Sequence, residues 1–225
     1  MSFYECLKAL PEGSDSASRL TLAAKRLGYR GIIICNAEPE KIFRPDAAFL
    51  VKGIEVTLGA EVKALNPRSL RSRVSSLRGR SPFIMVQGRF DEMIRAACED
   101  PNVDVLMHMD EARRPLGIAA AKSAKLNQVA IGFDLSPLIR FRGSSRSKWL
   151  DVQRRSIELV RKFDLSIMIS ANARSHLDLR SPRDIVALAE VIGLDHSEAV
   201  EAMKLPGKLL DLNRKDWRGP GVELL

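Results

Sequence analysis

The sequence has few of the residues that most often build a catalytic or metal centre. It contains three histidines and three cysteines among 225 residues. Cys6, Cys35 and Cys98 lack the spacing of metal ligands, and two of them lie in apolar runs, so we expect buried, reduced thiols. No P-loop, dinucleotide-binding glycine motif, HExxH or CxxC occurs. A barrel hydrolase with two or three metal ions needs many more converging ligands, so histidine cannot supply such a site here.

Long apolar runs and aromatic side chains are also scarce. No segment approaches the roughly 18 consecutive apolar residues of a membrane-spanning helix, and no apolar stretch follows a basic start. We therefore expect a soluble, cytoplasmic protein with no membrane partner. Aromatic residues make up 5% of the chain. Few aromatic side chains are therefore available to stack on bases, so we expect a nucleic acid to be recognised by its backbone shape and charge.

Positive charge, by contrast, is plentiful. The formal net charge is +8 and the sequence pI is about 9.7. This balance favours an anionic partner such as nucleic acid or a membrane surface, although a basic cytosolic enzyme would show the same balance. The length suits a single α/β domain over residues 1–225 better than two small domains.

Short apolar runs alternate with helical patterns along the chain. Such runs are typical of parallel strands that are covered on both faces. The later ones begin about 20 to 35 residues apart, which is the length of one βα unit. We therefore predict a TIM-barrel-like (β/α) barrel, closed or nearly closed, with an open doubly wound sheet as the alternative. The seven predicted strands are 3–7, 31–35, 54–58, 83–86, 103–107, 129–133 and 165–169.

Between these runs, cap residues mark several helices. Ser14–Ser16 can cap a first helix, and Gly28 lies where the C-terminal end of that helix is expected to need a residue with a left-handed backbone conformation. Ser181-Pro182-Arg183-Asp184 has the residue types of a helix start. The Ser- and Arg-rich stretch 66–80 is predicted to be a solvated loop, and 47–61 holds one strand or two. The apolar or small residues expected along three further helices are Met93, Ile94 and Ala97, then Ile118, Ala119 and Leu126, then Val152, Ser156, Leu159, Val160 and Phe163.

The stretch 129–194 is the most informative part of the chain. Two predicted strands there end in polar loops, and parallel strands deliver such loops to the same edge of a sheet. The first loop carries Arg140, Arg142, Arg146 and Lys148, and the second carries Arg174, His176, Arg180 and Arg183. We expect this edge to be strongly positive.

A small catalytic site is conceivable at the same edge. His108, Asp110, Asp134 and His176 lie at or just beyond predicted strand ends, where the catalytic residues of barrels gather. Two of them also have a structural explanation, which is a satisfied histidine for His108 and a loop-capping carboxylate for Asp134. No nucleophile–base pair is visible, so the sequence does not predict independent chemistry.

Two segments carry a family resemblance. VAIGFDLSPLI and RKFDLSIMISANARSHLDLRSPRDIVALAEVIGL, within residues 129–194, resemble the ribonuclease P protein component 3 family, the archaeal counterpart of the eukaryotic 30-kilodalton ribonuclease P subunit. RLGYRGIIICN and VKGIEVTLGAEV resemble it more loosely. The chain departs from the family at Asn172 and Ala173, where glycine and alanine are expected, and at Met107-His108-Met109.

The resemblance implies a barrel of the polymerase and histidinol phosphatase type without its metal site. It also implies a non-catalytic subunit of ribonuclease P, which supports RNA-catalysed removal of the 5′ leader from precursor tRNA. The implied partners are ribonuclease P RNA, ribonuclease P protein component 2, other protein subunits and precursor tRNA. In this interpretation the chain holds no cofactor, and the partner RNA holds the Mg²⁺. A metal-dependent phosphoesterase of the same barrel superfamily, or a pure protein-interaction scaffold, remains the alternative.

Arginine is suited to RNA phosphates because its guanidinium forms paired hydrogen bonds with them. The sequence and the resemblance together predict no catalytic and no metal-binding residues, and a set of RNA-binding residues at the strand-end loops. The predicted RNA-binding residues are Arg89, Arg113, Arg114, Arg140, Arg142, Arg174, His176 and Arg180.

Overall fold

A computed structural model describes residues 2–42, 51–107, 115–215, 217–219 and 222–223. All seven predicted strands are present within a residue or two of their predicted bounds. The region 47–61 contributes to two strands, β3 and β4, while its first residues lie outside the described ones. The strands are β1 (Tyr4–Leu7), β2 (Gly31–Ile34), β3 (Glu55–Leu58), β4 (Ala60–Val62), β5 (Ile84–Gln87), β6 (Val105–Met107), β7 (Ala130–Asp134), β8 (Ile167–Ser170), β9 (Trp217–Gly219) and β10 (Val222–Glu223).

The parallel strands follow one another in a ring. Strands β1, β2 and β3 form one parallel sheet and β4 to β8 form a second, each in chain order. Gly59 alone separates β3 from β4. At the other seam, Leu7 forms a parallel bridge with Ala173, and the Lys8 backbone N–H donates to the Ala173 carbonyl at 2.9 Å. A doubly wound sheet reverses its strand order at a switch point. This order has none, so the barrel-like prediction holds and the open-sheet alternative is wrong.

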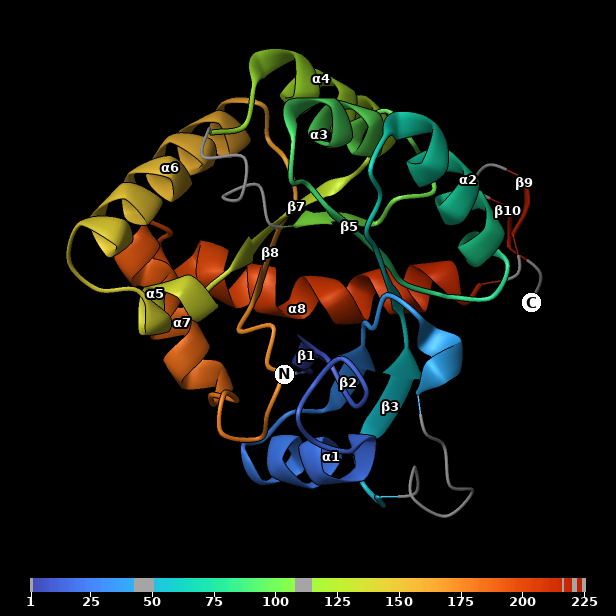
Figure 1. Ribbon diagram of the computed structural model, residues 1–225, viewed down its shortest axis with the longest axis vertical. Coiled ribbons are helices and arrows are strands. Elements are labelled where there is room, and N and C mark those ends of the chain that lie inside the picture. Colours follow the sequence, from blue (N-terminus) through green and yellow to red (C-terminus); the bar gives the residue numbers. More distant parts are fainter. Residues whose placement is uncertain (1, 43–50, 108–114, 216, 220–221, 224–225) are drawn as a thin grey trace.

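Helices cover the outside of the ring (Figure 1). Most of them connect one strand to the next, as in a (β/α) barrel. They are α1 (Ala17–Arg26), α2 (Pro67–Arg78), α3 (Asp91–Cys98), α4 (Ile118–Asn127), α5 (Ser136–Arg140), α6 (Gly143–Lys162), α7 (Pro182–Ile192) and α8 (His196–Asn213), with a short 3-10 helix at Pro39–Lys41.

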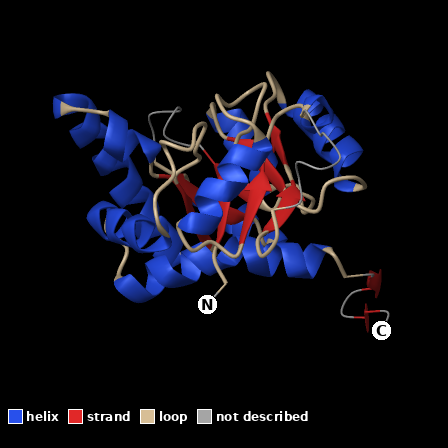
Figure 2. Cartoon of the chain, turned by 90° about the horizontal axis from the view of Figure 1, so that it is seen from below, coloured by secondary structure: helices blue, strands red, loops and turns tan. Residues whose placement is uncertain are grey.

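Helix α8 closes the end of the barrel at which the strands begin. Its Gly207 packs so closely on the Tyr4 ring that an added Cβ would lie 2.8 Å from it. Leu210 is buried with the side chains that fill the barrel interior, among them Ile33, Phe83 and Met85. Seen from below, α8 lies along one side of the strands, and β9 and β10 lie beyond its end (Figure 2). The strand-end loops at the opposite end are therefore the open face of the barrel.

Three expectations about helices need correction. The stretch 66–80 is largely helix α2, because Asn66 caps it and Leu70, Val74 and Leu77 form a buried stripe among its polar residues. In α4 the buried face is Ala120, Ala121 and Ala124, whereas Ile118 and Leu126 are exposed. The predicted arginine-rich loop after β7 is mostly helical, since α5 ends at Arg140 and α6 begins at Gly143.

Three cap predictions are confirmed. The Ser16 side chain accepts a hydrogen bond from the Arg19 backbone N–H at the start of α1. Gly28 follows that helix with a φ of 90°, a conformation that favours glycine. Ser181 and Asp184 form a reciprocal capping box at the start of α7. Among the described residues, no helix is long and apolar enough to cross a membrane.

Candidate functional site

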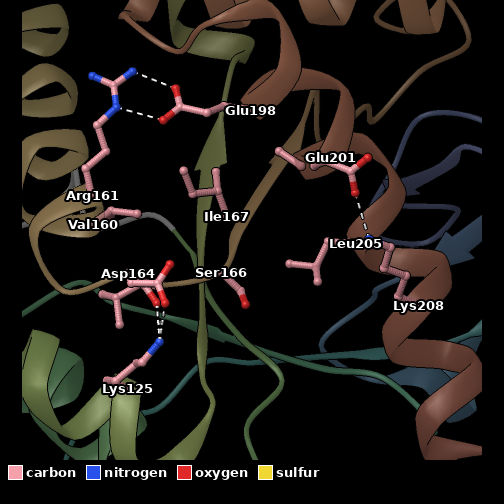
Figure 3. A pocket seen from close by; sticks show the side chains of 12 residues that line it. Lys125, Val160, Arg161, Asp164, Ser166, Ile167, Glu198, Glu201, Leu205 and Lys208 are labelled. Atoms are coloured by element: carbon pink, nitrogen blue, oxygen red, sulfur yellow. Dashed lines mark hydrogen bonds and ion pairs between the residues drawn. The ribbon is translucent and has the colours of Figure 1, made fainter.

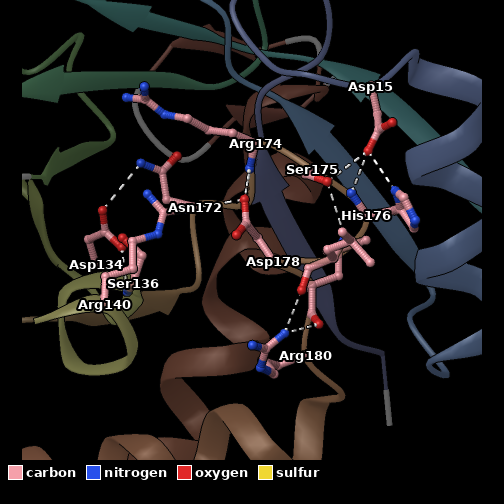
Figure 4. A network of polar contacts seen from close by, with 12 residues as sticks. Asp15, Asp134, Ser136, Arg140, Asn172, Arg174, Ser175, His176, Asp178 and Arg180 are labelled. Atoms are coloured by element: carbon pink, nitrogen blue, oxygen red, sulfur yellow. Dashed lines mark hydrogen bonds and ion pairs between the residues drawn. The ribbon is translucent and has the colours of Figure 1, made fainter.

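The loops after β7 and β8 meet at the open end of the barrel, as the sequence predicts. Arg140 Nη2, at the end of α5, lies 3.1 Å from Asp178 Oδ2 in the β8–α7 loop, which spans residues 171–181. Asp178 Oδ2 also accepts a weak hydrogen bond from the Arg174 backbone N–H at 3.3 Å. Figure 4 shows these side chains together. The ion pair therefore joins the two loops that carry most of the predicted RNA-binding residues.

The β8–α7 loop is also tied to the loop before α1. Asp15 Oδ2 accepts hydrogen bonds from the His176 backbone N–H at 2.7 Å, from His176 Nδ1 at 2.7 Å and from Ser175 Oγ at 3.0 Å. The bonds from His176 lower the pKa of Asp15 to about 2. Arg19 Nη2 lies 3.2 Å from the other ring nitrogen of His176. Sequence analysis missed Asp15 and Arg19 because no local pattern links them to a residue about 160 positions away.

The predicted RNA-binding arginines fall into two groups in the structure. Arg89, Arg142 and Arg174 are exposed. Arg89 stacks over the Phe90 ring, with 5.7 Å between the guanidinium carbon and the ring centroid. Within the described part of the chain, the guanidinium groups of Arg142 and Arg174 have no carboxylate within salt-bridge distance. They remain available to phosphate groups of a partner.

His176 and Arg180 are held more tightly. His176 is half-buried between Asp15 and Arg19. Arg180 Nη1 donates to the carbonyl oxygens of Leu177 and Leu179 at 2.8 Å each, so this side chain braces its own loop. Arg113 and Arg114, like His108 and Asp110, lie outside the described residues.

A charged cluster fills the barrel interior just below the open end. Lys8 and Glu61 are both buried and form a short ion pair, and Lys63 Nζ lies 3.3 Å from the same Glu61 oxygen. Asp134 caps the start of α5 by accepting from the Ser136 backbone N–H at 2.8 Å, as expected of a loop-capping carboxylate. No group of three or more histidine, cysteine, aspartate or glutamate side chains in the described ranges is placed to hold a metal ion. The buried cation paired with Glu61 is a lysine, which cannot ligate a metal ion while protonated.

A cavity of about 530 Å³ lies at the other end of the barrel, beside α8 (Figure 3). Its floor includes Ile167 and Leu205. Three ion pairs surround it, each with one cation and one anion, so the rim carries no excess charge. The pairs are Lys125–Asp164, Arg161–Glu198 and Lys208–Glu201. Arg142 and Arg174, which have no carboxylate within salt-bridge distance among the described residues, lie at the open end, and we take that end as the candidate site.

Comparison with known proteins gives a consistent family match. The model of the family described as RNase P subunit p30 matches residues 4–218. Ribonuclease P protein component 3 of Methanosarcina acetivorans is 37% identical over 222 residues, covering 97% of this chain and 92% of the relative. The protein of the same name from Halorubrum lacusprofundi is 35% identical, covering 94% and 91%.

Two solved structures are informative about the fold. A chain in a cryo-EM structure of archaeal ribonuclease P with mature tRNA superposes with a TM-score of 0.84 at 21% identity, covering 99% of this chain and 97% of that one. A histidinol phosphate phosphatase from Lactococcus lactis, complexed with zinc, L-histidinol and phosphate, gives 0.54 at 12% identity, covering 92% and 94%. The second likeness is to the barrel architecture alone.

Proposed function

The chain belongs to the family of ribonuclease P subunit p30, and we infer from this membership that it is a protein subunit of ribonuclease P in tRNA 5′-end processing. The observation that carries the inference is a family match over residues 4–218, supported by relatives about 35% identical over nearly their whole length. The match covers more than nine-tenths of this chain and of both relatives, rather than one shared motif.

The open end of the barrel supports a role in binding RNA. Arg174 lies on the β8–α7 loop, which the Arg140–Asp178 and Asp15–His176 contacts hold in place, and Arg142 follows Arg140 by two residues. Phosphate contacts of this kind position a protein on RNA without reading the base sequence. Arg89, Arg142 and Arg174 are the proposed direct phosphate contacts. Arg140, His176 and Arg180 have partners within the protein, so we assign them mainly to holding the loops in place.

We assign no catalytic step to the chain. Cleavage of a phosphodiester needs metal ions positioned at the scissile phosphate, and in this proposal the partner RNA holds the Mg²⁺. The buried Lys8–Glu61 pair supports this assignment, since a protonated lysine, which cannot ligate a metal ion, pairs with this buried carboxylate. The protein contributes by neutralising RNA charge and by holding the RNA in its active fold, which lowers the demand for Mg²⁺.

The proposed setting is the cytoplasm, and the proposed direct protein partner is ribonuclease P protein component 2. Other ribonuclease P proteins and precursor tRNA complete the assembly. Reconstitution tests this function. Precursor-tRNA cleavage by the cognate RNA and component 2 is measured with and without this chain over a range of Mg²⁺ concentrations. Addition should raise the rate and lower the Mg²⁺ concentration required, and an unchanged rate at every Mg²⁺ concentration would contradict the proposal.

The competing function, a metal-dependent phosphoesterase, shares only the barrel architecture with this chain. An activity assay separates the two. The purified, RNA-free protein is incubated with precursor tRNA and with a phosphate monoester, in the presence of Mn²⁺ or Zn²⁺. We expect no hydrolysis. Robust hydrolysis that a chelator abolishes would favour the enzyme instead.

A further inference from the structure

The β1–β8 seam of the barrel is joined partly by side chains. The described backbone pairing between these strands is limited to the region of Leu7 and Ala173. Two positions earlier on each strand, the Ala171 backbone N–H donates to Glu5 Oε1 at 2.9 Å. Ser170 Oγ lies 2.6 Å from the same Glu5 oxygen and 3.1 Å from the Cys6 carbonyl oxygen. The Glu5 and Ser170 side chains thus replace a stretch of the backbone ladder.

Glu5 is also linked to the far end of the β8–α7 loop. Its Oε2 lies 3.1 Å from the Tyr29 hydroxyl, which comes from the turn before β2. The same hydroxyl lies 2.9 Å from the Arg180 carbonyl oxygen. Glu5 and Tyr29 are both buried. Tyr29 therefore connects a carboxyl group inside the seam to the backbone next to the start of α7.

The hydrogen atoms needed for the contacts of the Tyr29 hydroxyl with Arg180 and Glu5 indicate the charge state of Glu5. A carbonyl oxygen only accepts hydrogen bonds, so the Tyr29 hydroxyl must give its single proton to Arg180 if that contact is a hydrogen bond. The contact between Tyr29 and Glu5 Oε2 then needs a proton from Glu5. An ionised Glu5 would leave one of these two contacts of the Tyr29 hydroxyl without a hydrogen. A neutral Glu5 that donates from Oε2 provides a hydrogen for both contacts.

The electrostatic surroundings agree with this count. Burial is the main effect that raises the pKa of Glu5, to about 7, and the negative charge of Asp134 on β7 raises it further. Hydrogen bonds from Ser170 and Ala171 act in the opposite direction, as would a hydrogen bond from Tyr29 if the phenol gave its proton to Glu5 instead of Arg180. Burial and the charge of Glu5 also raise the pKa of Tyr29, with a smaller effect of Asp184 on α7, so the phenol keeps its proton.

We propose that Glu5 is a neutral carboxylic acid in the folded protein below neutral pH and that, through Tyr29, it positions the Arg180 end of the β8–α7 loop. The loop carries Arg174 in its middle, so Glu5 and Tyr29 are positioning residues for a proposed RNA contact. That consequence rests on the proposed function, while the charge state and the loop contact do not.

The first test measures the charge state of Glu5 in the isolated protein. The side-chain carboxyl carbon of Glu5 is followed by NMR between pH 4 and 9, with Glu5→Gln to assign the signal. Glu5→Gln keeps a donor toward Tyr29 and an acceptor toward Ser170, so it mimics the neutral acid. We expect a midpoint near pH 7. A midpoint near the ordinary value of 4.5 would overturn the proposal.

The second test measures loop order by hydrogen exchange in Tyr29→Phe, which removes the hydroxyl and keeps the ring. Amides of residues 171–181 should exchange on the order of tenfold faster, as expected for one lost buried hydrogen bond. Amides of α4, on another part of the barrel, are the control and should not change. Equal acceleration of exchange in the loop and in α4 would indicate general destabilisation. Unchanged exchange in the loop would mean that the Tyr29 hydroxyl does not hold it. Either result overturns the proposal.

The functional consequence is measured in the reconstituted assembly. Tyr29→Phe should lower RNA affinity while Glu5→Gln leaves it at the wild-type level. If the wild-type chain itself gave no stimulation, the proposed function would fail and the charge-state result would stand. If the wild-type chain stimulated and Tyr29→Phe bound RNA equally well, the positioning role would be wrong and the proposed function would stand.

Discussion

Asp15 and His176 connect the first and the last strand-end loops of the barrel. Asp15 Oδ2 lies 2.7 Å from both the backbone nitrogen and the ring Nδ1 of His176. The connection crosses the same seam at which Leu7 bridges Ala173. An ionised carboxylate thus helps to hold the loop that carries Arg174.

Asp15→Asn should therefore destabilise the protein at neutral pH. Hydrogen bonds to a charged group are worth about 1.5–3 kcal/mol, so we expect a loss of about 2 kcal/mol in the free energy of unfolding. The folded-state pKa is lowered to about 2. The stabilisation is thus complete above the ordinary pKa of 3.8 and is lost as the pH falls toward 2.

Urea unfolding at pH 7 and at pH 3 measures this difference. Asp151→Asn is the control, since Asp151 forms an exposed pair with Arg155 on α6 and should change stability by less than about 0.5 kcal/mol. A loss of equal size at both pH values would contradict a role for the ionised carboxylate.

Lys8→Met should be strongly destabilising. The substitution leaves Glu61 buried without its closest cation, and breaking a buried ion pair costs about 3–5 kcal/mol. Lys63 remains near Glu61 and reduces the loss toward the lower end of that range. Thermal and chemical unfolding measure it, with Lys41→Met in the exposed Lys41–Glu38 pair as the control. A loss below about 1 kcal/mol would mean that the cluster does not depend on Lys8.

Arg174→Ala should separate RNA binding from stability. The guanidinium is exposed and has no carboxylate partner among the described residues, so the melting temperature should stay within experimental error of the wild type. RNA affinity should fall. The magnitude of the slope of log affinity against log salt concentration should decrease by about one unit, as expected for the loss of one phosphate contact. Lys208→Ala, at the opposite end of the barrel, should change neither quantity. An unaltered slope for Arg174→Ala would exclude a direct phosphate contact.

Ser181→Ala should act on stability and hardly on RNA. Loss of the capping box at α7 is expected to lower the free energy of unfolding by about 1 kcal/mol. Precursor-tRNA processing by the reconstituted assembly should then fall only near the melting temperature. Processing that is lost at moderate temperature in a folded variant would make the hydroxyl a direct contact.

The strands could be predicted from sequence because each is a short apolar run between polar segments. The caps at Ser16 and Ser181 could be predicted because they depend on residues within four positions. Helix α2 was missed because its buried stripe of Leu70, Val74 and Leu77 is hidden among serine and arginine. The start of α6 was missed because Gly143 and two serines favour a loop.

The contacts that organise the site were beyond local patterns. Asp15 and His176 are about 160 positions apart, as are Glu5 and Ser170, and they meet only because the barrel brings β1 beside β8. For the same reason, the sequence alone could not distinguish strand-end arginines that have partners within the protein from those that do not. In the structure Arg180 donates to the Leu177 and Leu179 carbonyl oxygens of its own loop, whereas Arg174 is exposed and has no carboxylate within salt-bridge distance among the described residues.

Directed hydroxyl-radical cleavage tests most directly whether the open end of the barrel faces RNA. Cys6, Cys35 and Cys98 are buried, so a single exposed cysteine can be labelled selectively with an iron chelate. Arg174→Cys places the label at the open end, and Lys208→Cys places it beside α8 at the other end. In an active reconstituted assembly, we predict cleavage of ribonuclease P RNA from position 174 and none from position 208. Cleavage from position 208 alone would contradict the account.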